Sequence, residues 1–396
     1  MLHRRNGCTK FAQVYMPFRV ENGLHLFQYV QLPETGGWLW VLKQISVRAP
    51  CLTLEKFEMK KSLIALAVLA ASGASMAQST VTLYGIADLW FGSVKSEAAG
   101  QSLTQTKLDS GGVNGSRWGM KGSEDLGGGL KANFDFQQGI SLDTGAGTST
   151  AATAFSRQSW VGVSGGFGAV RLGRTTTPFD DVAGASHAVF DSALSPTVRV
   201  FATSAYVGRY NNMMYYQAPD MGGFSGAIAY GLGEDKTATT SASSNMDFNL
   251  TYAAGPLSLQ FAYQTLDIAN TVALPNDKKF MVLGAKYAFG PATLKANYGK
   301  ADNIGNAANF DATDLQIGVD YAVSPALTVS ASYAKSDDNK TAGQFESARK
   351  GFGLAAAYTL SKRTFVYGGF ESDSATVANT SDTKTTVFAV GMQHRF

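Results

Sequence analysis

Residues 385–396, TTVFAVGMQHRF, end the chain on a run in which apolar and polar side chains alternate. Phe388 and Val390 lie on one face of an extended strand, and Phe396 lies on the same face. An apolar outer face and an aromatic residue at the lipid–water boundary are what the closing strand of a membrane β-barrel needs. The segment therefore predicts such a strand, and the rest of the chain should repeat its alternation.

A secretory signal peptide is predicted at residues 59–77. Lys60 and Lys61 form a short basic region, residues 63–71 are apolar, and small residues lead to Ala77. Cleavage there would leave Gln78 at the start of the mature protein, with residues 78–396 as the barrel. Residues 1–58 are then expected to be an upstream extension that is not part of the native protein. The alternative is a cytoplasmic extension attached to the signal.

Composition narrows the chemistry of residues 78–396. The leader, residues 1–77, holds 9 of the 33 basic and 4 of the 30 acidic residues, so its removal changes the net charge from +3 to −2. This balance does not favour a nucleic-acid partner. Both cysteines, Cys8 and Cys51, lie in the leader, which argues against a disulfide framework or a thiolate metal site. No cofactor or metal is expected.

Apolar residues stand at every second position through residues 257–264, 315–321 and 327–333, which predicts strands with one apolar face. The opposite face carries Lys286, Lys295, Asn297, Gln316, Asp320 and Ser330. So many polar groups suit a water-filled lumen, with the apolar face toward lipid and every backbone group paired by closure. A two-sheet sandwich is the alternative.

Turn signals set the number of strands. Short ones occur at 124–129, 164–168, 219–223, 254–256, 289–291, 323–325 and 360–362, and longer polar stretches, such as 234–244, 302–311, 337–346 and 374–383, alternate with them. Seven short turns and eight long loops give an all-β, 16-stranded antiparallel transmembrane β-barrel with short periplasmic turns and long extracellular loops. Sixteen strands enclose an aqueous channel.

The third long loop, residues 175–209, is longer than the others and more apolar than a free loop. Its apolar members are Phe179, Val182, Val189, Phe190, Leu194, Val198, Val200, Phe201 and Tyr206. We expect it to fold inward against the barrel wall and narrow the lumen. An external lid and a contact with a neighbouring subunit are the alternatives.

Several motifs, in order and with matching loop spacing, resemble the Gram-negative general porin family of β-proteobacteria over residues 78–396. They are VTLYGIAD (81–88), SRWGMKGSEDLG (116–127), RQSWVG (157–162), LGRTTTP (172–178), RYNN (209–212) and GMQHRF (391–396); NMM at 212–214 departs slightly from the usual wording. The resemblance implies a homotrimer inserted in the outer membrane from the periplasm. It also implies that the third loop forms the pore constriction and that the barrel-assembly machinery reads Phe396.

The candidate site residues lie around this lumen. Alternation places Arg117 and Lys121 on the inner face, opposite Trp118 and Met120. By resemblance Arg117, Arg157 and Arg209 correspond to the constriction arginines, with Arg174 beside the base of the loop, and Asp180, Asp181 and Asp191 facing them. The other predicted pore-lining residues are Lys121, Lys131, Asp135, Lys286 and Lys295. The alternatives are solvated rim charges, or ion pairs that hold the loop.

The predicted function is a general diffusion porin, a water-filled channel for passive passage of ions and small hydrophilic solutes. Because basic groups lie at the predicted constriction, we expect a preference for anions. Charges of both signs occur there, so the preference should be mild and should weaken with salt. Expected partners are two further copies of the chain, outer-membrane lipid and lipopolysaccharide, and the barrel-assembly machinery.

Two other functions compete with this one. A substrate-specific channel for sugars or phosphate would use aromatic or arginine side chains in the lumen. An outer-membrane barrel enzyme would need a histidine within a positioned network. Residues 78–396 hold only His187 and His394, without a recognisable Ser/His/Asp spacing, so no catalytic residue is predicted.

Overall fold

The computed structural model describes residues 15–20, 23–28, 80–148, 154–267, 277–304, 310–339, 347–377 and 381–396. The chain forms two compact units, residues 1–75 and 76–396. In the first, β1 (Tyr15–Val20) and β2 (Gly23–Gln28) form an antiparallel pair. The predicted signal peptide, residues 59–77, lies outside the described residues. None of the helices in the described ranges is long and apolar enough to span a membrane.

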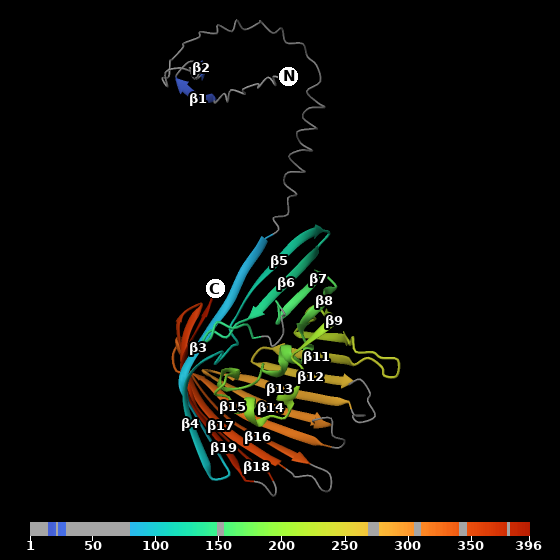
Figure 1. Ribbon diagram of the computed structural model, residues 1–396, viewed down its shortest axis with the longest axis vertical. Helices are drawn as coiled ribbons and strands as arrows, with labels where there is room; N and C mark the ends of the chain where they lie inside the picture. Colours follow the sequence, from blue (N-terminus) through green and yellow to red (C-terminus); the bar gives the residue numbers. More distant parts are fainter. Residues whose placement is uncertain are drawn as a thin grey trace, which may run out of the picture. The chain divides into compact units, whose positions relative to one another are not determined.

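The second unit is a closed antiparallel β-barrel (Figure 1). Its strands are β3 (Thr80–Ala98), β4 (Gln101–Ser110), β5 (Arg117–Gly127), β6 (Leu130–Gly139), β7 (Gln158–Gly165), β8 (Gly168–Thr176), β9 (Arg209–Gln217), β10 (Phe224–Leu232) and β11 (Ser244–Ala254). The sheet continues with β12 (Leu257–Asp267), β13 (Lys278–Phe289), β14 (Ala292–Asp302), β15 (Asp311–Ala322), β16 (Leu327–Asn339), β17 (Ser347–Ser361), β18 (Thr364–Val377) and β19 (Thr383–Arg395).

Two of these strands share one position in the barrel. Residues 80–86 of β3 pair with β5, and residues 89–98 pair with β4, so that β4 and β5 lie end to end along β3. The linker 111–116 interrupts what is otherwise a single strand. The barrel therefore has sixteen strand positions, which confirms the predicted number.

The connections follow the predicted alternation except at the first one. The seven predicted short turns join β5 to β6, β7 to β8, and each later pair up to β17 and β18. The first connection on the opposite rim is tight, because Ala99 and Gly100 both have positive φ, the geometry of a type I′ hairpin. In place of the expected long loop, β3 and β4 continue as a paired hairpin, and the 111–116 linker follows β4.

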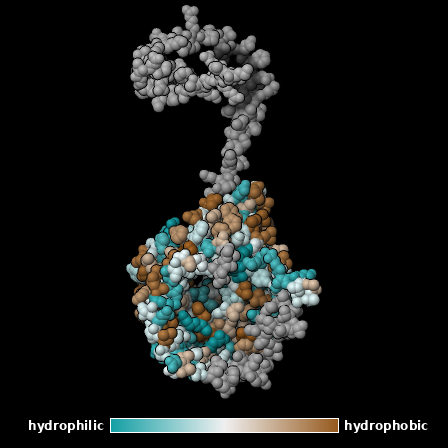
Figure 2. All heavy atoms as spheres, in the orientation of Figure 1, coloured by the Kyte–Doolittle hydropathy of each residue, from teal (hydrophilic) through white to brown (hydrophobic). Residues whose placement is uncertain are grey.

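The two faces of the wall have opposite character. Leu83, Leu283 and Ile317 are exposed on the outside, whereas Asn297 and Gln316 are buried on the inside. Figure 2 shows hydrophilic residues around a hollow in the barrel unit. The outer surface is therefore suited to lipid and the lumen to water.

The third long loop, residues 177–208 between β8 and β9, folds into the lumen, as predicted. Backbone and side-chain groups from Phe179 to Val207 bond to polar residues of the inner wall, namely Asp247, Gln264, Asn297, Asp314, Ser330 and Glu371 on β11, β12, β14, β15, β16 and β18. Most of its apolar side chains are buried as expected, but Val198 remains 51% exposed. The loop is thus held along more than a third of the wall.

The seam of the barrel joins the two ends of the sheet. β3 and β19 pair from residue 86 to residue 98 of β3, and the amide of Phe396 donates to the Gly85 carbonyl at 3.1 Å. Beside the seam, the buried carboxylate of Asp88 accepts hydrogen bonds from the amides of residues 112–114 and from Tyr367 and Gln393. Asp88 therefore connects β3, β18, β19 and the 111–116 linker.

Candidate functional site: the arginine-lined cavity

The third long loop begins with the short helix α2 (Pro178–Ala183). Thr177 caps it by accepting a hydrogen bond from the Asp180 amide at 3.2 Å, and Pro178 occupies its first turn. Phe179 and Val182 are buried against β11–β13, where the Phe179 amide donates to Asp247 at 2.8 Å. This packing leaves Asp180 and Asp181, in the first helical turn, on the side of the helix away from β11–β13.

The middle of the loop contains η1 (Val189–Asp191), followed by α3 (Thr197–Val200) and η2 (Thr203–Ala205). Val189, Phe190 and Asp191 have φ values of 55°, 61° and 50°, a left-handed conformation that costs energy for residues other than glycine. Burial of Val189, whose amide donates to Ser330 at 2.7 Å, holds this conformation. The strained turn places Asp191 beside the lumen.

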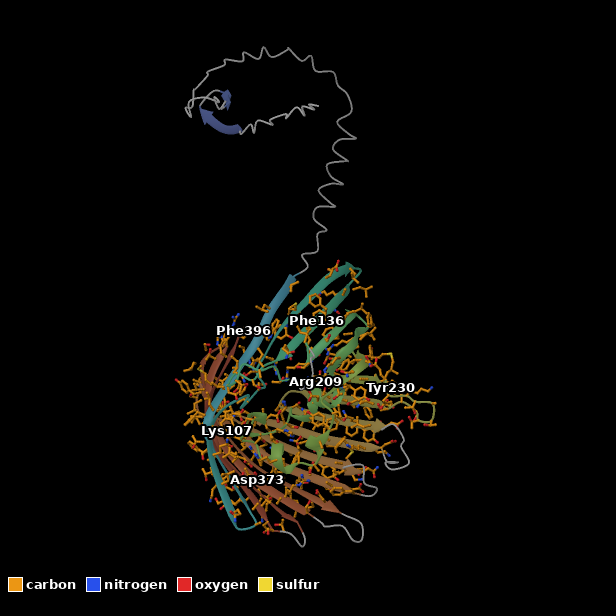
Figure 3. All side chains as sticks on the ribbon, viewed as in Figure 1. Lys107, Phe136, Arg209, Tyr230, Asp373 and Phe396 are labelled. Carbon is orange, nitrogen blue, oxygen red and sulfur yellow. The ribbon has the colours of Figure 1, made fainter. Side chains whose placement is uncertain are left out.

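The loop and the wall of β5–β9 enclose a cavity of about 490 Å³. It is lined by Arg117, Arg157, Arg209, Asp180, Asp181 and Asp191, together with polar groups that include Gln137, Gln158, Thr176 and Tyr206. Figure 3 shows Arg209 beside this loop within the barrel. Six of the seven predicted constriction residues are therefore brought together around one cavity.

The three acidic groups are all engaged by neighbours. Asp180 lies 3.7 Å from Arg209 and accepts a hydrogen bond from Tyr206 at 2.7 Å. Asp181 accepts from Thr176 at 2.8 Å and from Tyr215 at 2.7 Å. Asp191 is 2.7 Å from His187 Nδ1. Their carboxylates are thus fixed in position rather than free to follow a passing ion.

Two of the three arginines, Arg117 and Arg157, are held by neutral groups, whereas Arg209 lies near Asp180. Arg157 donates to Gln137 at 2.8 Å, and Arg117 donates weakly to the Gly115 carbonyl at 3.3 Å. Arg117, Arg157 and Arg209 all line the same cavity, so their positive charges act on it together. Because only Arg209 has a carboxylate within ion-pair distance among the described residues, the other two guanidinium groups keep donors for solutes.

Arg174 is not among the residues that line this cavity, and it lies near the end of β8, where the third long loop begins. It lies within a register shift between Gly173 and Thr175, and the φ of 133° at Gly173 suits glycine alone. Its guanidinium donates to the Ser156 carbonyl at 2.6 Å and to Asn211 at 2.7 Å. Arg174 therefore links β9 to the segment that precedes β7.

The predicted pore-lining residues belong to the inner face but differ in their neighbours. Lys121 is paired in register with Asp135, and its ammonium lies 5.0 Å from the Tyr84 ring. Lys131 is exposed beside the β5–β6 turn. Lys295 is 2.7 Å from Asp320 and donates to the His187 carbonyl, so it holds the loop; Lys286 lies opposite it on β13.

Sequence reasoning missed three residues of this region. The hydroxyls of Tyr206 and Tyr215 position Asp180 and Asp181. Arg171 packs against Tyr215 on the inner wall. Alternation in residues 169–173 could have placed Arg171 inward, whereas the two tyrosine contacts join segments that no local pattern relates.

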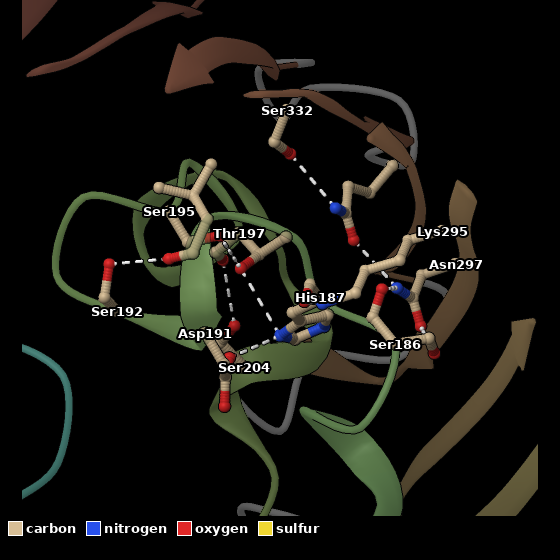
Figure 4. Close-up of polar contacts among 12 residues, drawn as sticks. Ser186, His187, Asp191, Ser192, Ser195, Thr197, Ser204, Lys295, Asn297 and Ser332 are labelled. Carbon is tan, nitrogen blue, oxygen red and sulfur yellow. Dashed lines mark hydrogen bonds and ion pairs between the residues drawn. The ribbon is translucent and has the colours of Figure 1, made fainter. Parts of the chain in front are cut away.

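The histidine of the loop does not form a catalytic triad. Figure 4 shows His187 beside Asp191 and Thr197. Both contacts, at 2.7 Å and 3.4 Å, use the same ring nitrogen, Nδ1. A triad needs one ring nitrogen for the carboxylate and the other for the nucleophile. This arrangement instead braces the loop, whose carbonyl at residue 187 accepts from Lys295.

A closed barrel with an apolar outer face, a polar lumen and an inward loop bearing charges of both signs defines a membrane-spanning pore protein. The model of the Gram-negative porin family matches residues 63–378. Outer membrane porin protein 32 of Delftia acidovorans is 36% identical over 323 residues, covering 78% of this chain and 88% of that protein. An outer membrane porin protein of Bordetella pertussis is 29% identical, covering 85% and 100% respectively.

Among solved structures, the anion-selective porin from Comamonas acidovorans matches with a TM-score of 0.67 and 28% identity, over 81% of this chain and all of that one. The chain belongs to the Gram-negative porin family. It is an outer-membrane β-barrel and a general diffusion porin, which confirms the predicted fold class, location and function.

The charge of the cavity should depend on pH through Asp180. Burial raises the pKa of this carboxyl above its ordinary value, although Arg209 and the Tyr206 hydroxyl oppose the shift. As pH falls, Asp180 should therefore be protonated earlier than an exposed aspartate, and the cavity should lose a negative charge. Anion preference should increase, measured as the reversal potential of single channels in a salt gradient between about pH 7 and about pH 4.

The variant Asp180→Asn provides the control for this pH effect. It removes the titrating group while keeping its size, so its reversal potential should show a smaller pH-dependent change. An equal change in the variant and the wild type would assign the titration to other carboxyls and contradict the prediction.

Proposed function

We propose that the arginine-lined cavity is the constriction of the pore and gives this general diffusion porin a mild preference for anions. The observation that carries the proposal is the arrangement of Arg117, Arg157 and Arg209 around the same cavity as three fixed aspartates. Charges of both signs across a narrow gap produce a transverse field, in which polar solutes can orient and apolar ones are disfavoured. The matching solved porin that is described as anion-selective is consistent with this preference.

The different partners of the aspartates and the arginines support a mild preference for anions rather than strict ion selectivity. Each aspartate is engaged by Tyr206, Tyr215, His187 or Arg209, while Arg117 and Arg157 have no carboxylate at ion-pair distance among the described residues. Unpaired positive charge attracts anions, but the three carboxylates keep the cavity open to cations. Salt should screen both contributions.

Several predicted properties accompany this function. Residues 59–77 would act as a cleaved export signal, and Phe396 as a signal for barrel assembly. The mature barrel would form a homotrimer in contact with lipid and lipopolysaccharide. Catalysis is not proposed, because the family is one of channels and His187 braces the loop.

Ion conductance across a planar lipid bilayer tests the proposal, with protein lacking residues 1–77 and a salt gradient across the membrane. We expect stepwise insertion of open channels in groups of three, and a reversal potential on the anion side that moves toward zero at high salt. A reversal potential near zero at low salt would contradict the anion preference. Absent conductance from a folded barrel would contradict an open constriction.

A further inference from the structure

A second basic region lies on the inner wall, between the arginine-lined cavity and the β5–β6 and β7–β8 turns. It borders a cavity of about 350 Å³ whose lining includes Lys121, Asp135, Trp160 and Arg171. Lys121, Asp135 and Trp160 form one row across β5, β6 and β7, and Arg171 on β8 lies opposite Tyr215 on β9. Lys121 is four residues from Arg117 along β5, or about 13 Å at the usual rise of a strand. The two basic regions are therefore separate.

Arg171 is held by aromatic rings rather than by carboxylates. Its guanidinium carbon lies 5.1 Å from the centre of the Trp160 ring and 4.8 Å from that of Tyr215. Cation–π contact with two rings holds the guanidinium but uses none of its five N–H donors. Across the described ranges, the Arg171 side chain has no hydrogen bond or ion pair with the protein. Its donors therefore remain for water or a solute.

Lys121 shows the same arrangement on the next part of the wall. Its ammonium lies 5.0 Å from the centre of the Tyr84 ring, and it too has no ion pair with another described residue. Asp135, the acid between the two cations, accepts the Tyr84 hydroxyl at 2.5 Å and is attracted by both Lys121 and Arg171. The three charges together leave one positive charge on this part of the lumen.

We propose that this region is a second anion site of the channel, and that it favours small carboxylates with a flat aromatic body. The inference rests on the proposed anion-permeable function of the pore. Guanidinium and ammonium donors bind a carboxylate. The half-buried rings of Trp160 and Tyr84, on the same face, offer apolar surface on which a planar solute can stack. An aromatic carboxylate uses both features, whereas acetate or chloride uses only the charge.

The proposal predicts that benzoate binds the open channel more tightly than acetate does. Channels of the mature protein are recorded in potassium chloride, and sodium benzoate or sodium acetate is added on the periplasmic side. Benzoate should reduce the chloride current at a concentration at which acetate has little effect. In Arg171→Gln and Lys121→Gln, the apparent benzoate affinity should fall by roughly two- to fivefold, the factor expected for one cation–π or charged contact.

Lys286→Gln is the matched control. Lys286 is also a lysine of the inner wall, but it does not line the cavity that Lys121, Trp160 and Arg171 border. Its benzoate affinity should remain that of the wild type. Should Arg171→Gln fail to fold, the exposed Lys121→Gln variant still tests the site. Equal effects of benzoate and acetate on a wild-type channel that prefers chloride over potassium would overturn this site alone. A wild-type channel without anion preference would instead overturn the proposed function.

Discussion

Replacing Arg117, Arg157 and Arg209 together with glutamine should move the reversal potential from the anion side to the cation side. The three aspartates of the cavity would then face no arginine, so its local charge would become strongly negative. Charges a few ångströms from an ion contribute about 1 kcal/mol each even in water, so the anion-to-cation permeability ratio should fall by on the order of tenfold or more. Bilayer recordings in a potassium chloride gradient measure this ratio directly.

The control for this triple variant is Arg363→Gln, because Arg363 is an exposed arginine in the short β17–β18 turn. It should leave the ratio almost unchanged. Raising the salt concentration should reduce the difference between the triple variant and the wild type, since exposed charges are screened over about 10 Å at 0.1 M. An unchanged ratio in a folded triple variant would show that selectivity arises elsewhere in the lumen.

Replacing Asp88 with alanine should strongly destabilise the barrel. The substitution leaves the amides of residues 112–114, the Tyr367 hydroxyl and the Gln393 amide group without their acceptor in a buried place. Loss of a charged acceptor with several donors should cost at least about 3 kcal/mol. The measurement is the temperature at which the folded barrel unfolds in detergent, followed by its electrophoretic mobility.

Asp220→Ala serves as the comparison for Asp88. Asp220 is exposed, and its carboxylate accepts a hydrogen bond from the Gly223 amide, at 3.3 Å, in a short turn. Its loss should lower the unfolding temperature only slightly. Similar unfolding temperatures for Asp88→Ala and Asp220→Ala would contradict the role assigned to Asp88 at the seam.

The sequence allowed the faces of the strands to be predicted, because alternation is a local property of every strand. Leu283 and Ile317 face outward and Asn297 and Gln316 inward for this reason. The turn signals were equally local, and they predicted the number of strand positions. The inward fold of the third loop followed from its apolar content, although Val198 shows that composition does not place each side chain.

What the sequence could not show depends on contacts between distant segments. Arg157 precedes the first residue of β7, so alternation does not assign its direction, and its bond to Gln137 on β6 places it at the cavity. Arg174 lies in the register shift between Gly173 and Thr175, so alternation along β8 does not assign its direction, and its bonds to Ser156 and Asn211 place it. The division of one strand into β4 and β5 depends on Asp88, which lies about twenty-five residues earlier in the chain.

The seam between β3 and β19 has a consequence for how the chain folds. Ile86 pairs with Arg395, so this contact closes a loop of nearly the whole barrel, whereas the other neighbouring strands are joined by a single turn or loop. Pairings between residues so far apart in sequence are slow, because the chain between them must be ordered first. Until closure, the growing sheet keeps two unpaired edges, which can add strands from other molecules. The chain therefore needs protection from aggregation until β3 has paired with β19.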